Sequence, residues 1–157
     1  MVRMAQEQTE ENGKADGFNA AELAALYQMI GMGALKFYLL RVDPKKRMMF
    51  DPAESIQLQG HTGPFIQYTH ARIKSILRKA ESLNINPEVG DLKNLKSLEP
   101  SEREVIFKIN QYTNKLQEAA REYSPAIVAN YAYELAKSFN QFSILSYTIQ
   151  HIHKSLL

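Results

Sequence analysis

Hydrophobic positions along the 157-residue chain recur with the spacing of helices, and local capping signals mark where those helices begin. In Asn19-Ala-Ala-Glu22, the Asn is placed to accept hydrogen bonds from the first turn, and the Glu three residues later completes a capping box. In Asp51-Pro52-Ala53-Glu54, Asp is a suitable N-cap and Pro suits the first helical position. No segment has a convincing strand pattern and no repeat is found. The sequence therefore predicts an all-α fold, with its helices packed as a bundle.

Glycine and proline residues set the other predicted boundaries. Gly31 and Gly33 are expected to break the helix that starts at Asn19, and Asp43-Pro44 to end the next one, because a residue before proline is disfavoured in the α region. The predicted segments are a loose opening at 7–17, helices at 19–30, 34–41 and 64–83, a short helix from Asp51, a loop at 84–97, and helices from about Pro100 and from Pro125, the last with Ser124 as N-cap.

The apolar positions of these helices predict the core. On a helical wheel of segment 64–83, one apolar stripe is expected to face inward. The expected core residues are Leu35, Phe37, Leu39, Ile66, Ile73, Ile76, Leu77, Leu135 and Phe139.

Composition adds two restrictions. The chain has no cysteine, which excludes a disulfide scaffold and a thiolate metal site. The net charge of +2 does not by itself indicate a nucleic-acid partner, but the charge is unevenly distributed. From Ser55 through Ala80 there is no Asp or Glu, whereas Arg72, Lys74 and Arg78 lie in that stretch. Such an asymmetry can produce a basic footprint on a nearly neutral protein.

The polar side of segment 64–83 combines cations with an aromatic ring. Its members are Gln67, Tyr68, Ala71, Arg72, Lys74, Ser75, Arg78 and Lys79. Single-stranded RNA is bound by such combinations, because unstacked bases lie on aromatic rings while cations follow the phosphates. A basic helix face is more often only a solvated surface, so periodicity alone leaves both interpretations open and favours the second.

Several stretches carry a specific resemblance. Gly60-His-Thr-Gly-Pro-Phe-Ile-Gln-Tyr-Thr-His-Ala-Arg-Ile73 resembles the motif that opens the anticodon-binding domain of arginyl-tRNA synthetases. Arg41–Arg47 and Phe50–Ile56 resemble the segments that precede it, and Tyr123–Phe142 resembles a later helix of that domain. Gly33-Ala-Leu-Lys36 is similar to the Asp-Ala-Leu-Arg sequence that names the domain, with Gly and Lys replacing Asp and Arg.

The resemblance covers about residues 17–142 and implies a domain division. Residues 1–50 are expected to be a linker and helices at the end of a catalytic region, and 51–157 to be a helical anticodon-binding domain that is truncated or altered after about residue 142. Gln57 stands where the family usually has an acidic residue. Residues from Ser143 onward do not match the family's closing segment, so we expect them to be the least ordered part.

The resemblance also implies a function. The family joins arginine to its tRNA at the expense of ATP, and the two nucleotide-binding signatures of its catalytic domain are absent from this sequence. We therefore expect no catalytic residue, no metal and no cofactor in this chain, which should be inactive alone. ATP with Mg²⁺ is implied for the full-length enzyme. The implied partners are the anticodon loop of tRNA(Arg) and the catalytic domain of the same enzyme, in the cytoplasm, with neither a membrane nor DNA involved.

The wheel and the resemblance together predict the site residues. Tyr68 is expected to stack on an anticodon-loop base with Gln67 near it. The expected phosphate contacts are Arg72, Lys74 and Arg78.

Three other features of the sequence indicate further possibilities. An apolar tail, consisting of Ile144, Leu145, Ile149, Ile152 and Leu156, supports the alternative of a non-catalytic helical protein-interaction module. His151 and His153 are two residues apart, so they point to different faces of a helix and make a poor zinc pair. Lys45-Lys46-Arg47 suits a phosphate contact and a solvated connector equally well.

Overall fold

The computed structural model describes residues 1–11, 17–85 and 97–155, with side chains described through residue 143. All the regular secondary structure in these ranges is helical, which confirms the all-α prediction. The helices are α1 (Val2–Glu11), α2 (Ala20–Leu40), α3 (Pro52–Ser55), α4 (Gly63–Ser82), α5 (Pro100–Asn110), α6 (Tyr112–Glu122) and α7 (Pro125–Ser155).

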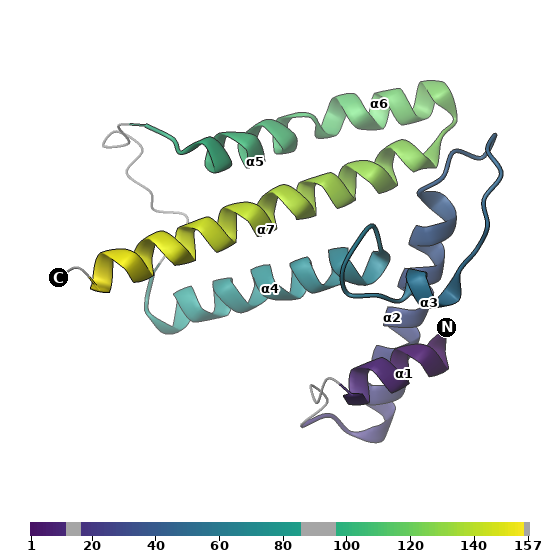
Figure 1. Ribbon diagram of the computed structural model, residues 1–157, viewed down its shortest axis with the longest axis horizontal. Coiled ribbons are helices and arrows are strands. Elements are labelled where there is room, and N and C mark those ends of the chain that lie inside the picture. Colours follow the sequence, from purple (N-terminus) through teal and green to yellow (C-terminus); the bar gives the residue numbers. More distant parts are fainter. Residues whose placement is uncertain (12–16, 86–96, 156–157) are drawn as a thin grey trace.

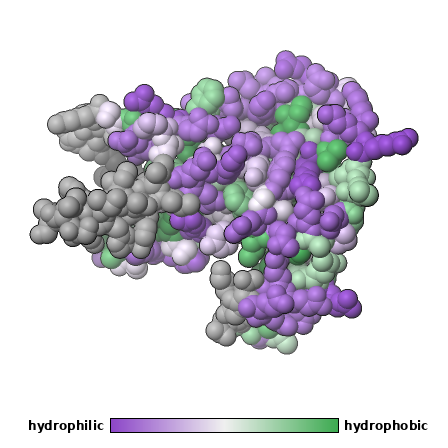
Figure 2. Space-filling view, in the orientation of Figure 1, coloured by the Kyte–Doolittle hydropathy of each residue, from purple (hydrophilic) through white to green (hydrophobic). Residues whose placement is uncertain are grey.

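The long helix α7 organises the molecule. It lies between α4 on one side and the α5–α6 pair on the other, and it contacts all three. Helix α2 crosses the end of this layer and packs against α1, α3, α4 and α7 (Figure 1). The space-filling view of the same side is mostly hydrophilic with scattered hydrophobic patches (Figure 2). Most of the apolar side chains in that view are thus dispersed over a polar surface.

The predicted break at Gly31 and Gly33 is wrong, because α2 continues through both residues. A Cβ on Gly31 would lie 3.0 Å from backbone atoms of Met1 and Val2, and one on Gly33 would lie 2.3 Å from Nε2 of Gln67. Glycine costs up to about 1 kcal/mol relative to alanine inside a helix. Here the missing side chains allow α1 and α4 to approach α2 closely, so packing overrides the helix propensity.

The closest approach in this region joins α2 and α4. A Cβ on Gly63 would lie 2.7 Å from the carbonyl oxygen of Gly33, which is a backbone atom that cannot move without displacing its helix. Gly63 is the first residue of α4 and is buried. The first turn of α4 is therefore set directly against the backbone of α2.

We expect Gly63→Ala to destabilise the fold by about 1–3 kcal/mol, the usual cost of overpacking a core. In a protein of this size the melting temperature would fall by about 2–4 °C per kcal/mol. Differential scanning calorimetry of the variant measures the loss. Ser75→Ala, an exposed position on the same helix, serves as the control. A Gly63→Ala protein that melts with the wild type would show that the two backbones are not in this contact.

The capping predictions at Asn19 and Asp51 are confirmed. Asn19 Oδ1 accepts from the backbone N–H groups of Ala21 and Glu22, each at 3.0 Å, and Glu22 Oε2 accepts from the Asn19 N–H at 2.9 Å. Asp51 caps α3 in the same way, with Pro52 as its first residue. The hydroxyl of Thr62 accepts from the Phe65 N–H at 3.3 Å and so caps α4. The helix expected from Pro100 is interrupted at Gln111, which separates α5 from α6.

The opening of the chain differs from the loose stretch expected at 7–17. Residues Val2–Glu11 form α1, whose Ala5 is fully buried against Ala34 and Ile56; residues 12–16 lie outside the described ranges. Polar composition suggested disorder, whereas a small buried face is sufficient to hold this helix on α2. Most of the loop expected at 84–97 also lies outside the described residues.

The predicted core is partly wrong. Leu35, Phe37, Ile66, Ile73, Leu135 and Phe139 are partly buried, but Leu39, Ile76 and Leu77 are 47%, 46% and 44% exposed. The fully buried hydrophobic positions are mainly small residues and tyrosines, such as Ala34, Tyr38 and Ala136. Ile76 and Leu77 lie in the C-terminal half of α4. This half extends away from α2, although α7 still runs alongside it (Figure 1).

Helix α2 is long and apolar enough, judged by length and composition alone, to cross a membrane. Core helices of globular proteins satisfy the same criterion. Because α1, α3, α4 and α7 all pack against α2, we interpret it as the central helix at this end of the bundle.

Candidate nucleic-acid interface on helix α4

The predicted site residues all lie on α4, but they fall into two rows along it. Side chains four and seven residues apart share one line on a helix. Tyr68 and Arg72 therefore form one row, and Gln67, Lys74 and Arg78 form a second. Tyr68 is 45% exposed, Lys74 and Arg78 are exposed, and Arg72 is partly buried. The structure thus leaves an aromatic ring and three cations accessible along one helix.

Lys79 belongs to the first row and was not among the predicted contacts. It lies seven residues after Arg72 and is exposed. The helical wheel placed it on the polar side, and only the spacing from Tyr68 and Arg72 distinguishes it as their continuation. Within the part of the chain that the structure describes, Arg72, Lys74, Arg78 and Lys79 form no ion pair. These charges are consequently available to an anionic partner.

Gln67 occupies a different environment from the other predicted contacts. Its Nε2 donates to the backbone carbonyl of Met29 on α2 at 3.1 Å, across the gap left by Gly33. The side chain is partly buried and spans the α2–α4 contact. The sequence placed Gln67 on the polar face of α4 correctly, but this part of the face is covered by α2.

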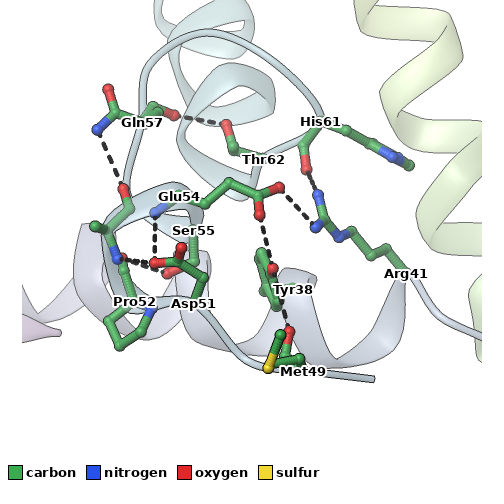
Figure 3. Close-up of polar contacts among 11 residues, drawn as sticks. Tyr38, Arg41, Met49, Asp51, Pro52, Glu54, Ser55, Gln57, His61 and Thr62 are labelled. Atoms are coloured by element: carbon green, nitrogen blue, oxygen red, sulfur yellow. Dashed lines mark hydrogen bonds and ion pairs between the residues drawn. The ribbon is translucent and has the colours of Figure 1, made fainter. Parts of the chain in front are cut away.

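A polar network fixes the loop that leads into α4 (Figure 3). The guanidinium of Arg41, at the C-terminal end of α2, donates to Glu54 Oε1 at 2.9 Å and to the carbonyl oxygen of His61. It also lies over the Tyr38 ring, 3.9 Å from its centroid. The Tyr38 hydroxyl donates to Glu54 Oε2 at 2.9 Å. Hydrogen bonds from Arg41 and then from Tyr38 hold the pKa of Glu54 below its ordinary value.

Thr62 closes this loop. Its hydroxyl donates to the carbonyl of Gln57 at 2.6 Å, and the residue is almost fully buried. Gln57, which stands where an acidic residue was expected, donates through Nε2 to the carbonyl of Ala53 at 3.1 Å. The segment from Asp51 to Thr62 is therefore tied to its own backbone at both ends, and the start of α4 is held in place.

Helix α7 holds the other side of α4. Asn140 Nδ2 donates to Thr69 Oγ1 at 2.8 Å, and the rings of Phe65 and Tyr133 are 5.3 Å apart. Asn130 Nδ2 donates to the carbonyl of Arg41 at 3.0 Å. The contacts of Thr69 and Phe65 fix which side of α4 faces the bundle and leave the Tyr68 row on the outside, whereas the Asn130 bond joins α7 to the end of α2.

His61 is packed at the junction of α2, α4 and α7. Its ring centroid lies 4.2 Å from that of Tyr133 and 5.4 Å from that of Phe37, and its Nε2 is buried without a hydrogen-bond partner. Burial, and then the charge of Arg41, lower the pKa of His61 below its ordinary value, against a smaller opposing effect of Glu134. The folded state therefore favours the neutral form of this imidazole.

We expect acid to destabilise the fold through His61. Below about pH 6.5 the unfolded chain binds a proton at this residue that the folded chain does not, so the free energy of unfolding falls as the pH falls. Urea unfolding at about pH 7.5 and about pH 5.5 measures the difference. His61→Gln should reduce it, whereas His70→Gln, at an exposed position of α4, should not. An unchanged pH dependence in His61→Gln would contradict the assignment.

Two other pockets among the described residues lack an accessible set of unpaired cations like that of α4. An open groove of about 460 Å³ between α5, α6 and α7 is lined by Lys108 and Lys115, but these pair with Glu104 at 3.7 Å and Glu118 at 2.7 Å. A second, near Lys46 and Ser124, contains Asp43, whose carboxylate accepts from the Ser124 hydroxyl at 3.4 Å. The lysines of the first groove are thus paired with carboxylates, and the second pocket contains a carboxylate of its own, unlike the row of Tyr68, Arg72 and Lys79 on α4.

The remaining predicted features have different outcomes. Lys45, Lys46 and Arg47 are exposed, which suits both of their interpretations. No group of three or more His, Cys, Asp or Glu residues suited to a metal occurs among the described residues. The side chains of His151, His153 and the apolar tail lie outside the described ones, although the α7 backbone is helical to Ser155.

Comparison with known proteins gives a consistent set of matches. The model of the DALR anticodon binding domain family matches residues 66–149, a range that includes all five predicted site residues. An arginine–tRNA ligase of Amoebophilus asiaticus is 50% identical over 142 residues, which are 90% of this chain and 24% of that protein. One of Flavobacterium psychrophilum is 49% identical over 142 residues, or 90% of this chain and 23% of that protein.

The structural comparison agrees. The Thermus thermophilus arginyl-tRNA synthetase matches with a TM-score of 0.74 and 33% identity, over 88% of this chain and 22% of that one. The chain spans about a quarter of the length of the curated relatives it matches.

Proposed function

Because the chain belongs to the DALR anticodon binding domain family, we propose that it is the tRNA anticodon-binding portion of an arginine–tRNA ligase. The observation that carries the proposal is the set of cations on α4, Arg72, Lys74, Arg78 and Lys79, which form no ion pair with the described residues and lie inside the matched range. In the full-length enzyme this portion contributes to the ATP-dependent arginylation of tRNA, and ATP with Mg²⁺ is bound elsewhere in that enzyme. The cytoplasm is the expected location.

The side chains of α4 suit two different kinds of contact with RNA, base stacking and phosphate binding. The Tyr68 ring offers a stacking surface to an unstacked base of the anticodon loop, and Arg72, Lys74 and Arg78 neutralise loop phosphates. Lys79 extends the Tyr68 row by a further cation. Because α2, α7 and the 51–62 loop all fix α4, the helix that carries the ring and the cations is in place before RNA arrives, which reduces the entropic cost of binding.

We place the contact with the catalytic portion on residues 1–50. Several large apolar side chains of this region are exposed, among them Phe18, Met29 and Leu40. A helix as apolar as α2, with such residues uncovered, suits packing against further protein. The catalytic portion of the same enzyme is the partner that we propose for it.

The proposal is tested with RNA hairpins. Fluorescence anisotropy of the 157-residue chain should detect binding to a labelled anticodon stem–loop of tRNA(Arg), weaker binding to the same stem with a changed loop, and less to a DNA duplex of equal length. Affinity should fall linearly with salt on logarithmic axes. Failure to distinguish the hairpin from DNA would refute the proposal. Self-association without RNA binding would instead favour the protein-interaction module.

A further inference from the structure

The side-chain amide of Gln67 lies in the contact between α2 and α4. Its Nε2 donates to the Met29 carbonyl at 3.1 Å, and the absence of a side chain at Gly33 makes room for it. A Cβ at Gly33 would lie 2.3 Å from Nε2 and 3.1 Å from Cδ of Gln67. The amide thus fills a space that only glycine leaves open.

The other end of this amide, Oε1, is unpaired among the residues that the structure describes. Gln67 Oε1 is buried and accepts no hydrogen bond from the described residues. Leaving a buried acceptor unsatisfied costs free energy, and a hydrogen bond returns only a modest net gain. An apolar side chain of similar length would avoid that cost. Maximal stability therefore does not account for an amide at this position.

What the amide provides is a directional link between two helices. Met29 lies inside α2, so its carbonyl is fixed by the helix backbone. Gln67 is in the second turn of α4 and directly precedes Tyr68. Consecutive residues are about 100° apart around a helix of 3.6 residues per turn. Holding Gln67 against α2 therefore restricts the rotation of α4 and with it the direction of the Tyr68 side chain.

We propose that Gln67 is a positioning residue for RNA binding, whose bond to α2 sets the direction of the Tyr68 ring; this rests on the proposed function. The role differs from the direct contact with the anticodon loop expected from the sequence. With one N–H of Nε2 bonded to α2 and Oε1 buried, most of the amide's hydrogen-bonding capacity is directed at α2 and away from RNA. The link also joins α2, in the region placed against the catalytic portion, to the surface that binds the anticodon loop.

The test is a double-mutant cycle in the 157-residue chain. Gln67→Met keeps the length of the side chain and removes its hydrogen bond. We expect it to weaken binding of the tRNA(Arg) anticodon hairpin by between about threefold and tenfold. This loss of affinity is smaller than the loss expected when the whole stacking contact is removed. The melting temperature should stay close to that of the wild type, because one bond and one unsatisfied acceptor are removed together. In a Tyr68→Ala background, Gln67→Met should have no further effect on affinity.

Gly33→Ala supplies an independent test, because the added Cβ must displace the Gln67 amide. It should reproduce the loss of affinity with Gln67 intact, and Gln67→Met should add nothing to it. Without RNA, NMR residual dipolar couplings that report the orientation of α4 relative to α2 should change in both variants. Unchanged affinity in Gln67→Met, or an equal loss with and without Tyr68, would overturn the positioning role. If the wild-type chain bound no hairpin, the proposed function would be refuted. Unchanged couplings in the two variants would separately refute the link between Gln67 and the direction of Tyr68.

Discussion

Replacing Tyr68 with alanine is expected to weaken binding of the anticodon hairpin by about tenfold to a hundredfold. Stacking of a base on one aromatic ring is worth about 1–3 kcal/mol, and 1.4 kcal/mol is a factor of ten. The side chain is 45% exposed, so its removal should leave the fold intact. Anisotropy titrations for affinity and calorimetry for stability measure the two effects separately.

Tyr123 provides a matched control. Its ring is 88% exposed and lies outside α4, in the turn between α6 and α7. Tyr123→Ala should bind the hairpin as the wild type does. If Tyr68→Ala bound equally well and melted at the same temperature, the ring would be neither a stacking surface nor a packing residue. A loss of stability that matched the loss of affinity would indicate packing.

Reversing two charges on α4 is expected to weaken binding of every RNA tested. Arg72→Glu with Lys74→Glu replaces two phosphate contacts by like-charge repulsion, which costs several kcal/mol, so the loss should exceed about tenfold. The salt dependence should also flatten, because the logarithmic slope falls by about 0.7 for each single-strand phosphate that the protein no longer neutralises. Titrations at several salt concentrations measure both quantities.

Net charge is controlled by a second pair of substitutions. Lys36→Glu with Arg121→Glu changes the charge of the protein by the same amount, at exposed positions of α2 and α6. This variant should keep most of the affinity and the salt slope of the wild type. An equal loss in both double variants would mean that overall charge, rather than the α4 row, attracts the RNA.

Local signals in the sequence were sufficient for most of the helix starts. Asn19 and Asp51 cap their helices through atoms within three residues, so the information lies in the segment itself. Gly31 and Gly33 were misinterpreted because the reason for them lies elsewhere in the chain. Gly33 is opposed by Gly63 and Gln67 on α4, and Gly31 by the first residues of α1. Glycine inside an apolar helix can thus indicate a close crossing instead of a break.

The candidate site was predictable in outline only. Periodicity identified the polar side of α4 and therefore Tyr68 and its cations. It could not show that α2 crosses the start of that side and covers Gln67, because the crossing depends on which helices pack together. The same limitation explains Ile76 and Leu77. Their spacing marks an apolar stripe, but burial also depends on how fully the neighbouring helices cover that part of α4, which periodicity does not show.

The pairing of α4 with α7 has a consequence for synthesis of the protein. The hydrogen bond between Thr69 and Asn140 joins residues that are 71 positions apart in the chain. At about 5–20 residues per second, a ribosome needs roughly 4 to 14 s to make Asn140 after Thr69. During that interval the apolar stripe of α4 has emerged without its partner. The nascent chain should therefore expose a binding site for chaperones until α7 is complete.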